Sequence, residues 1–260
     1  MIKIGKIIYK IYVIIFHIFV WVPMLVVILL SFNNSESPTL PWLGFTTRWY
    51  STALQNNLFA DSLIVSLIIC FGVTSISVIV GLLTAMAFVR YDFPGRNLLR
   101  ISQFIPVVLP GVVFGISLLV LAYNFKIKTG YILTILATST WNVTYGTLII
   151  ASRLEKFDYA IEEAALDLGA NNIRALWRVT IPFLAPAIIV AGLYTFINSF
   201  NDFNTTIFVI GDHVTFPIFM FSNMRSTLTP EINAISAMLA LPLILTGLIN
   251  TFIQRKTRVK

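Results

Sequence analysis

Long apolar segments with almost no charge constrain this chain more than any other feature. Six of them follow one another, at residues 11–32, 62–89, 98–123, 130–151, 183–210 and 232–253. A helix rises about 1.5 Å per residue, so about 20 apolar residues cross a hydrocarbon core about 30 Å thick. The chain is 57% hydrophobic and 11% charged, whereas soluble domains are about 25% charged. The sequence therefore predicts an all-α integral membrane protein with six transmembrane helices in a single domain.

Lysine and arginine are distributed unevenly among the segments that join these helices. Fourteen of the 18 basic residues fall in the two tails, the turn at residues 90–100 and the loop at residues 152–182. The other four are Arg48, Lys126, Lys128 and Arg225. Basic residues accumulate on the cytoplasmic side of membrane proteins, so we expect both termini and the 152–182 loop to be cytoplasmic. This distribution also explains the net charge of +7 without a nucleic-acid partner.

The first apolar segment has the length of a membrane span rather than of a cleaved signal peptide. A signal peptide has a shorter apolar core followed by a small-x-small cleavage site, and residues 29–33 contain no such site. The single cysteine, Cys70, excludes an intramolecular disulfide framework, and His17 and His213 lie on different segments. We therefore predict an uncleaved first span and no metal site.

The most strongly patterned polar stretch lies in the loop between the fourth and fifth apolar segments. Small and aliphatic side chains recur there at helical spacing, at Ile161, Ala164, Ala165 and Leu168. Glu162, Glu163 and Asp167 belong to the same helix, whose N-terminal dipole favours negative charge. Gly169 can take the left-handed conformation that ends a helix. The pattern predicts a short helix that ends near Gly169.

A second short helix is expected directly after the first. Asn171 or Asn172 can cap its N-terminus. Arg174 and Arg178 give it a basic face, and we expect Pro182 to close it. The loop is therefore predicted to be a compact helix-turn-helix.

The spacing within this loop resembles a known pattern. Gly169 stands four residues after the end of Glu163-Ala164-Ala165, and Pro182 follows thirteen residues later. This arrangement resembles the EAA loop of ABC-importer permease subunits, except that Val179 and Ile181 stand where that family usually has Ile and Leu. The resemblance implies docking onto a cytoplasmic ATPase, which would move the permease through Glu163, Ala164, Ala165, Asp167, Gly169 and Pro182. The alternative is an ordinary amphipathic helix pair at the membrane surface.

Polar side chains are also concentrated in the fifth apolar segment, residues 183–210. Such side chains are costly within a membrane span and are therefore candidates for function. Asn198, Asp202 and Thr206 recur at i, i+4 and i+8, so a helix presents them on one face. Asp202 would lie about 28 Å along that helix from Phe183, towards its outer end. We expect this face to line water or a partner helix.

Two roles for Asp202 follow from this position. In a water-filled cleft of low dielectric, the carboxylate would attract ammonium groups, with Asn198 and Asn201 beside it. Alternatively, Asp202 makes structural hydrogen bonds in a seam between helices.

Two further places are candidates for the same pathway. Trp141, Asn142 and Tyr145 lie at helical spacing in the fourth segment and can add aromatic and amide contacts, although packing against neighbours is the alternative. Glu231 lies at the start of the sixth segment, where it can join the pathway or cap the helix.

Several segments together narrow the resemblance to one branch of the permeases. They are Trp42–Tyr50, Val89–Gly95, the EAA region, Asn201-Asp202 ahead of Phe208–Gly211, and Pro230–Ala234. Together they resemble the second permease subunit of spermidine/putrescine ABC importers. In that family an acidic residue in the setting of Asp202 is associated with polyamine passage. The usual pattern has two adjacent acids, whereas Asn201 stands beside Asp202 here, and related permeases for opines, iron or phosphonate-like compounds stay open as alternatives.

The resemblance also implies the partners and the location. It implies a bacterial inner-membrane importer in which this subunit pairs with a homologous permease, as a heterodimer surrounded by membrane lipids. Two ATPase subunits would lie below, and a periplasmic binding protein would deliver the substrate. The sequence contains no Gly-x-x-x-x-Gly-Lys-Ser/Thr loop, so we expect a non-catalytic chain without a cofactor, with ATP bound by the partner.

Two other functional classes are less well supported by the sequence. A membrane-embedded enzyme needs a cluster of nucleophile, base or metal ligands within the spans, and Asp202 has no histidine partner. An ion-coupled secondary transporter would show an inverted internal repeat and charged residues at the middle of the membrane. Neither feature is evident in the sequence.

Overall fold

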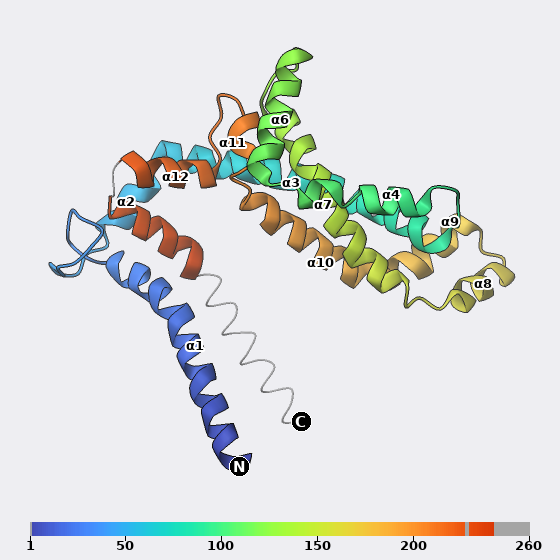
Figure 1. The fold of residues 1–260 in the computed structure, drawn as a ribbon, viewed down its shortest axis with the longest axis horizontal. Coiled ribbons are helices and arrows are strands. Elements are labelled where there is room, and N and C mark those ends of the chain that lie inside the picture. Colours follow the sequence, from blue (N-terminus) through green and yellow to red (C-terminus); the bar gives the residue numbers. More distant parts are fainter. Residues whose placement is uncertain (1, 227–228, 242–260) are drawn as a thin grey trace. The chain divides into compact units, whose positions relative to one another are not determined.

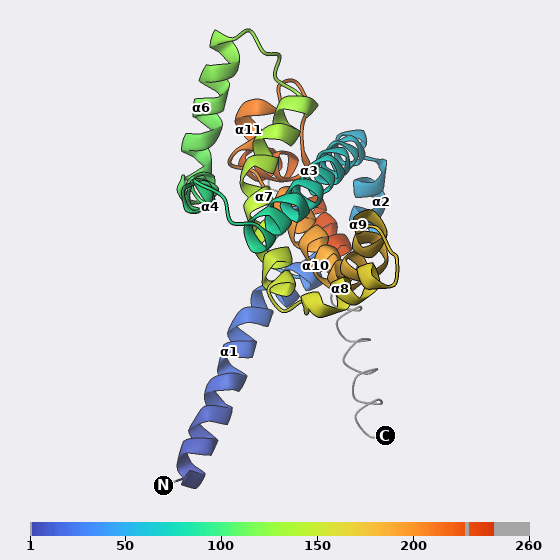
Figure 2. The same ribbon diagram turned by 90° about the vertical axis from the view of Figure 1, so that its right-hand side faces the viewer.

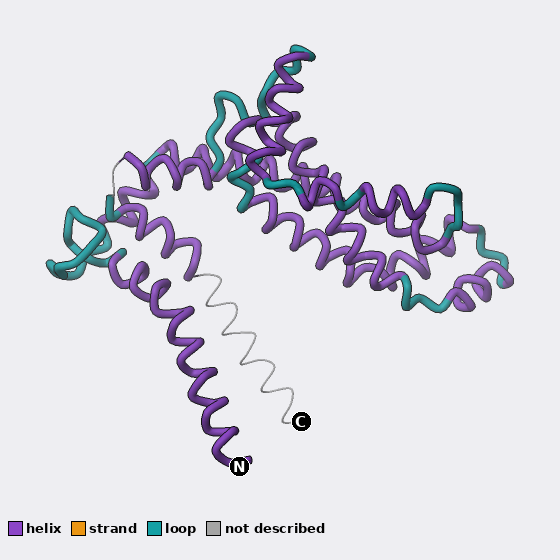
Figure 3. Tube along the Cα trace, viewed as in Figure 1, coloured by secondary structure: helices purple, strands orange, loops and turns teal. Residues whose placement is uncertain are grey.

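The computed structural model describes residues 2–226 and 229–241, and within these ranges the regular elements are helices. One isolated bridge joins Asn33 to Phe45. Figure 1 shows the order of the helices along the chain, and Figure 3 shows the loops that join them. The chain divides into two compact units, one comprising the N-terminal residues up to Ala60 with the chain from Phe219 onward, and the other comprising Asp61–Ile218. The prediction of an all-helical chain is confirmed.

Helices long and apolar enough to cross a membrane account for much of the described chain. Three qualify: Tyr9–Leu30 within α1 (Ile2–Leu30), α3 (Asn57–Arg90), and the continuous stretch Asn172–Phe200. A bent pair at Arg96–Val108 and Gly111–Asn124 makes a fourth if it is taken as one span. Helix α7 (Tyr131–Leu154) is long enough but more polar, with several buried threonines. Of the sixth predicted span, the helix Glu231–Leu241 is described, and residues 242–253 lie outside the described residues. Six spans therefore stay a prediction.

The third predicted span is not one kinked helix. It consists of α4 (Arg96–Ser102), α5 (Ile105–Val108) and α6 (Gly111–Asn124), with a bend of 100° at the break before α6. Pro110 precedes α6, and Leu109 before it is extended, as expected of a residue that precedes proline. The change of direction between α4 and α6 is visible in Figure 2.

The fifth predicted span begins earlier and ends earlier than predicted. Helix α9 (Asn172–Ala175), the π-helical turn η1 (Leu176–Thr180) and α10 (Ile181–Phe200) run on without a break. The expectation that Pro182 closes the second short helix is therefore wrong. Proline lacks an N–H and is tolerated in the first turn of a helix, and Pro182 lies in the first turn of α10.

The end of this helix corrects a second prediction. α10 stops at Phe200, Asn201 is its C-cap, and the next helix, α11, covers Thr206–Val209. Asn198, Asp202 and Thr206 therefore do not lie on one face of a single helix. Asp202 belongs to the connection between the two helices.

Two of the segments that join the predicted spans also contain helices. α2 covers Arg48–Gln55 and α12 covers Phe216–Ser226. The buried Asn33 side chain organises the loop before α2: its Oδ1 accepts from the Leu43 N–H, its Nδ2 donates to the Thr39 and Pro41 carbonyls, and its own carbonyl accepts from the Trp49 indole.

Close packing of α3 against α7 provides the core of the unit Asp61–Ile218. A Cβ atom on Gly81 would lie 2.9 Å from the Thr147 nitrogen, and one on Gly146 would lie 2.8 Å from the Ser77 carbonyl oxygen. Ser77 and Ala85 are fully buried. The small residues Ser77, Gly81 and Ala85 of α3 therefore serve helix packing, since only glycine allows two helix backbones to approach this closely.

Candidate functional site

A cavity of about 270 Å³ in the unit Asp61–Ile218 brings together most of the predicted polar side chains. Its lining comes from the broken third span, from α7 and from the end of α10, namely Pro106, Val107, Leu109, Gly111, Phe114, Trp141, Tyr145, Asn198, Asn201, Asp202, Asn204 and Thr205. Five of the residues predicted from sequence are among them. These are Trp141, Tyr145, Asn198, Asn201 and Asp202.

Asp202 is held in place by two hydrogen bonds. Its Oδ1 accepts from the Thr205 N–H at 3.0 Å, which caps the turn into α11. Its Oδ2 accepts from the hydroxyl of Thr138 on α7 at 3.3 Å, and Thr138 is fully buried. The carboxylate lines the cavity and also ties the end of α10 to α7, and its attraction for ammonium groups stays a prediction.

The amide side chains around the cavity differ from Asp202 in their bonding. Asn201 donates to the carbonyl of Ile197 in its own helix at 3.0 Å. The side chains of Asn198 and Asn204 make no hydrogen bond to other described residues. Their amide groups are therefore available to water or to a bound molecule.

Aromatic rings form the α7 wall of the cavity. Trp141 and Tyr145 meet edge to face with centroids 6.2 Å apart, and Tyr145 packs against Tyr194 of α10 at 5.1 Å. The faces of aromatic rings carry partial negative charge and attract cations. The wall therefore has the same electrostatic preference as the Asp202 carboxylate.

Three predicted residues lie elsewhere. Asn142 is fully buried in α7, where its amide donates to the Thr138 carbonyl at 2.9 Å. Thr206 is buried in α11 and is not part of the cavity lining. Glu231 belongs to the other compact unit, where its Oε1 accepts from the side chain of Asn56 at 2.9 Å.

The broken third span also lines the cavity, with residues that were not among the predicted site residues. A Cβ on Gly111 would lie 3.0 Å from Asn204 Cβ, and one on Gly115 would lie 3.1 Å from the Thr205 carbonyl oxygen. The break before α6 therefore lies against the connection that follows α10. The prolines at 106 and 110 were the available signal, because proline in a membrane helix frees backbone carbonyls that often line a cavity.

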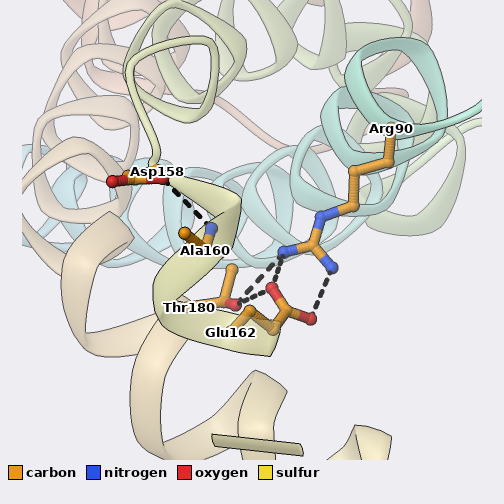
Figure 4. A network of polar contacts seen from close by, with 5 residues as sticks. All are labelled: Arg90, Asp158, Ala160, Glu162 and Thr180. Carbon is orange, nitrogen blue, oxygen red and sulfur yellow. Dashed lines mark hydrogen bonds and ion pairs between the residues drawn. The ribbon is translucent and has the colours of Figure 1, made fainter. Parts of the chain in front are cut away.

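The 152–182 loop forms the second candidate site and matches most of its prediction. α8 covers Tyr159–Asp167, and the Asp158 side chain caps it by accepting from the Ala160 N–H (Figure 4). Gly169 has a φ of +89°, the left-handed conformation that was predicted. Asn171, rather than Asn172, caps the next helix by accepting from the Arg174 N–H.

One side of α8 is open to the outside of the chain. Glu163, Ala164 and Asp167 are exposed, and Leu168 is 90% exposed beyond the end of the helix. Exposed aliphatic side chains on a short helix with acidic neighbours are typical of a surface that another protein covers. This face contains Glu163, Ala164 and Asp167 of the predicted coupling residues, whereas Ala165 is half-buried and Pro182 lies in α10.

The opposite side of α8 carries a bonded cluster that was not predicted. Arg90 at the end of α3 forms a bidentate ion pair with Glu162 at 2.7 and 3.1 Å. Thr180, in the turn η1, donates to the same carboxylate at 2.8 Å and accepts from Arg90 at 3.1 Å. Figure 4 shows the three side chains converging, and we call them the Glu162 cluster.

Comparison with known proteins identifies the family of this chain. Residues 77–258 match the family described as "Binding-protein-dependent transport system inner membrane component". The chain is 34% identical to the putrescine transport system permease protein PotI of Escherichia coli strain K12, over 85% of this chain and 81% of that protein. It is 32% identical to the spermidine/putrescine transport system permease protein PotC of Haemophilus influenzae, over 92% and 93%.

Solved structures show the same fold. A bacterial ABC transporter involved in the import of the acidic polysaccharide alginate has a chain with a TM-score of 0.69 and 16% identity, covering 97% of this chain and 96% of that one. An amino acid ABC transporter solved with histidines has a TM-score of 0.57 and 20% identity, covering 81% and 100%. The chain belongs to the family of inner membrane components of binding-protein-dependent transport systems, and is a non-catalytic permease subunit of an ABC transporter.

Proposed function

We propose that this chain forms half of the translocation pathway of a bacterial importer for polyamines or a closely related small cationic solute. The observation that carries the proposal is the cavity in which the Asp202 carboxylate meets the rings of Trp141 and Tyr145. A carboxylate and aromatic faces in a confined, poorly hydrated space both favour ammonium groups. The names of PotI and PotC, which are putrescine and spermidine/putrescine permeases, support the same solute class.

The proposed topology has six spans with both termini in the cytoplasm. Residues 152–182 then lie on the cytoplasmic side, between the fourth and fifth spans. The support is the uneven distribution of basic residues and the run of apolar segments. This places the exposed side of α8 where an ATPase can reach it.

The proposed assembly contains a homologous permease, two ATPase subunits and a periplasmic binding protein. The alginate transporter was also solved in complex with a ligand-bound periplasmic protein, which supports the last of these partners. We propose that ATP-driven movement enters through Glu163, Ala164 and Ala165 on α8. The two permeases would then rock against each other and expose the cavity alternately to each side.

Residue 201 keeps a second class of solute, with less positive charge than a polyamine, as a candidate. Asn201 replaces the second acid of the usual polyamine pattern, so this cavity has a single carboxylate within the described lining. A monoamine, an opine or a metal-bearing solute would need less negative charge than a polyamine.

Reconstitution of the complete transporter tests the proposal. The chain, its partner permease, the ATPase and the binding protein would be placed in proteoliposomes. Uptake of labelled putrescine and spermidine would be measured beside an opine, a ferric chelate and a phosphonate. We expect ATP-dependent uptake of the amines. Uptake of only an anionic solute, or a chain that purifies without any ATPase, would refute the proposal.

A further inference from the structure

Two adjacent glutamates in α8 point to opposite sides of the helix. The Glu162 side chain is only 15% exposed and lies in the Glu162 cluster, whereas Glu163 is exposed. Glu163 belongs to the pattern that identifies the coupling loop, and Glu162 precedes it. The two side chains have the same chemistry but different surroundings, so they are suited to different tasks.

The Glu162 cluster joins three separate parts of the unit. Arg90 is the last residue of α3, Glu162 lies in the first turn of α8, and Thr180 is the last residue before α10. Both carboxylate oxygens of Glu162 are bonded, and Thr180 is fully buried. One side chain of the coupling helix is thus bonded to the last residue of α3 and to the residue that precedes α10, within the candidate span Asn172–Phe200.

The geometry of this cluster restricts rotation as well as separation. A bidentate arginine-carboxylate pair fixes the planes of both groups, which a single contact does not. The Arg90 guanidinium also lies 5.5 Å from the ring of Tyr159, the first residue of α8. Two contacts about one turn apart therefore hold the start of α8 at a defined angle to the end of α3.

The other contacts of α8 constrain its orientation less strongly than this ion pair does. Within the described part of the chain, the Arg90–Glu162 pair is the one ion pair between α8 and another helix. Before α8, the buried ring of Phe157 packs against Phe183 of α10 at 5.1 Å, but apolar packing permits sliding and rotation. The charged pair supplies the directional constraint.

We propose that the Glu162 cluster makes α8 move as one body with α3 and α10, so that Arg90, Glu162 and Thr180 are positioning residues for coupling. This inference rests on the proposed docking of α8 to an ATPase. A shift of α8 would pass directly to the end of α3 and to the start of α10, and α10 carries Asn198 and leads to Asp202 at its far end. Without the cluster, the ATPase would still bind the exposed side of α8, but its motion would be absorbed within the loop.

The test compares matched variants of the two glutamates in the complete transporter. Glu162→Gln keeps the size of the side chain and removes its charge, and Glu163→Gln is the control. We expect Glu162→Gln to lower the amount of solute moved per ATP hydrolysed by about tenfold while the ATPase still co-purifies. Glu163→Gln should instead weaken co-purification of the ATPase, because Glu163 lies on the exposed side of α8.

Two further variants separate positioning from general stability. Arg90→Lys keeps the charge but loses the bidentate fork, and should lower the same ratio. Exchange of the two charges, Arg90→Glu with Glu162→Arg, should restore most of it, because the Thr180 hydroxyl can donate to one partner and accept from the other in either arrangement. A wild-type ratio in Glu162→Gln, or equal losses of assembly and transport at an unchanged ratio, would overturn the inference. Failure of the wild-type chain to bind any ATPase would instead refute the proposed function.

Discussion

The Asp202 cavity and the Glu162 cluster are both polar groups inside an apolar unit, but they differ in how completely they are bonded. In the Glu162 cluster the carboxylate accepts three hydrogen bonds from two residues, Arg90 and Thr180, on two other elements. In the cavity, Asp202 accepts two hydrogen bonds, while the amides of Asn198 and Asn204 bond to no other described residue. A buried carboxylate with both oxygens bonded holds elements together, although the buried Nε of Arg90 has no hydrogen-bond partner among the described residues, and unbonded amides leave groups for a solute. The difference therefore separates a site that transmits force from a site that receives a ligand.

The backbone conformation also differs between the two sites. The Glu162 cluster lies at helix ends, whereas the cavity lies where helices are broken, at Leu109-Pro110 and at residues 201–205. Within a membrane, irregular backbone is tolerated where it is buried in protein or lines a water-filled space. Broken helices that face each other are thus a second indication that the cavity lies on a solute pathway.

The largest expected effect comes from removing the support that the two sites share. α7 contributes Thr138, Trp141 and Tyr145 to the cavity and packs against α3, which ends at Arg90. In Gly146→Val, the new side chain would meet the α3 backbone, and we expect the free energy of unfolding to fall by about 3 kcal/mol. Thermal unfolding of the purified protein in detergent measures this change.

Gly192→Ala is the matched control for that variant. A Cβ on Gly192 would meet no atom closer than 3.8 Å in its surroundings, so the substitution should leave stability nearly unchanged. Equal stability of the Gly146 and Gly192 variants would show that the close α3–α7 contact does not support both sites.

The next effect distinguishes charge from hydrogen bonding in the cavity. Asp202→Asn keeps an oxygen that can accept from the Thr205 N–H but removes the negative charge. We expect the KM for a cationic solute to rise by at least about tenfold, or about 1.4 kcal/mol, with basal ATP hydrolysis unchanged.

Thr138→Val is the companion variant, because it removes one hydrogen bond and leaves the carboxylate. It should change the KM less than Asp202→Asn does. If Thr138→Val impaired uptake as strongly and Asp202→Asn had no effect, Asp202 would be a structural residue and the contrast between the two sites would disappear.

The smallest effect concerns the local caps of the coupling loop. Asn171→Ala removes the cap on the Arg174 N–H and should lower local stability by about 1 kcal/mol, while Asn171→Ser should retain most of it. Hydrogen exchange in residues 171–176 would report the difference. An unchanged exchange rate in Asn171→Ala would mean that the loop is held by the Glu162 cluster rather than by its own caps.

The coupling loop could be predicted in detail because its signals are local. Gly169 and Asn171 act on backbone groups within four residues, and both do so in the structure. The cap of α8 is Asp158, which was not predicted, and the predicted Glu162 pairs with Arg90 instead. The pairing of Arg90 with Glu162 spans 72 residues and has no such signal. Two charged residues near the ends of different helices gave no indication that they would meet.

The sequence identified several residues of the cavity correctly, but it did not predict their arrangement in space. Helical spacing correctly grouped Trp141 with Tyr145, since both lie on the unbroken α7. The same argument failed for Asn198, Asp202 and Thr206, because hydropathy does not register a break within an apolar segment. A local signal was present, since Asn and Asp at 201, 202 and 204 favour turns by bonding to nearby backbone, as Asp202 does to Thr205.

Site-specific cross-linking tests most directly whether α8 is the contact with the motor. In a Cys70→Ala background, cysteine placed at Glu163 would be compared with cysteine placed at the buried Thr180 in the assembled transporter. We predict that the cysteine at position 163 cross-links to the ATPase and is labelled only from the cytoplasmic side, and that the cysteine at 180 does neither. Labelling of position 163 from the periplasmic side, with no cross-link to an ATPase, would contradict the proposed coupling.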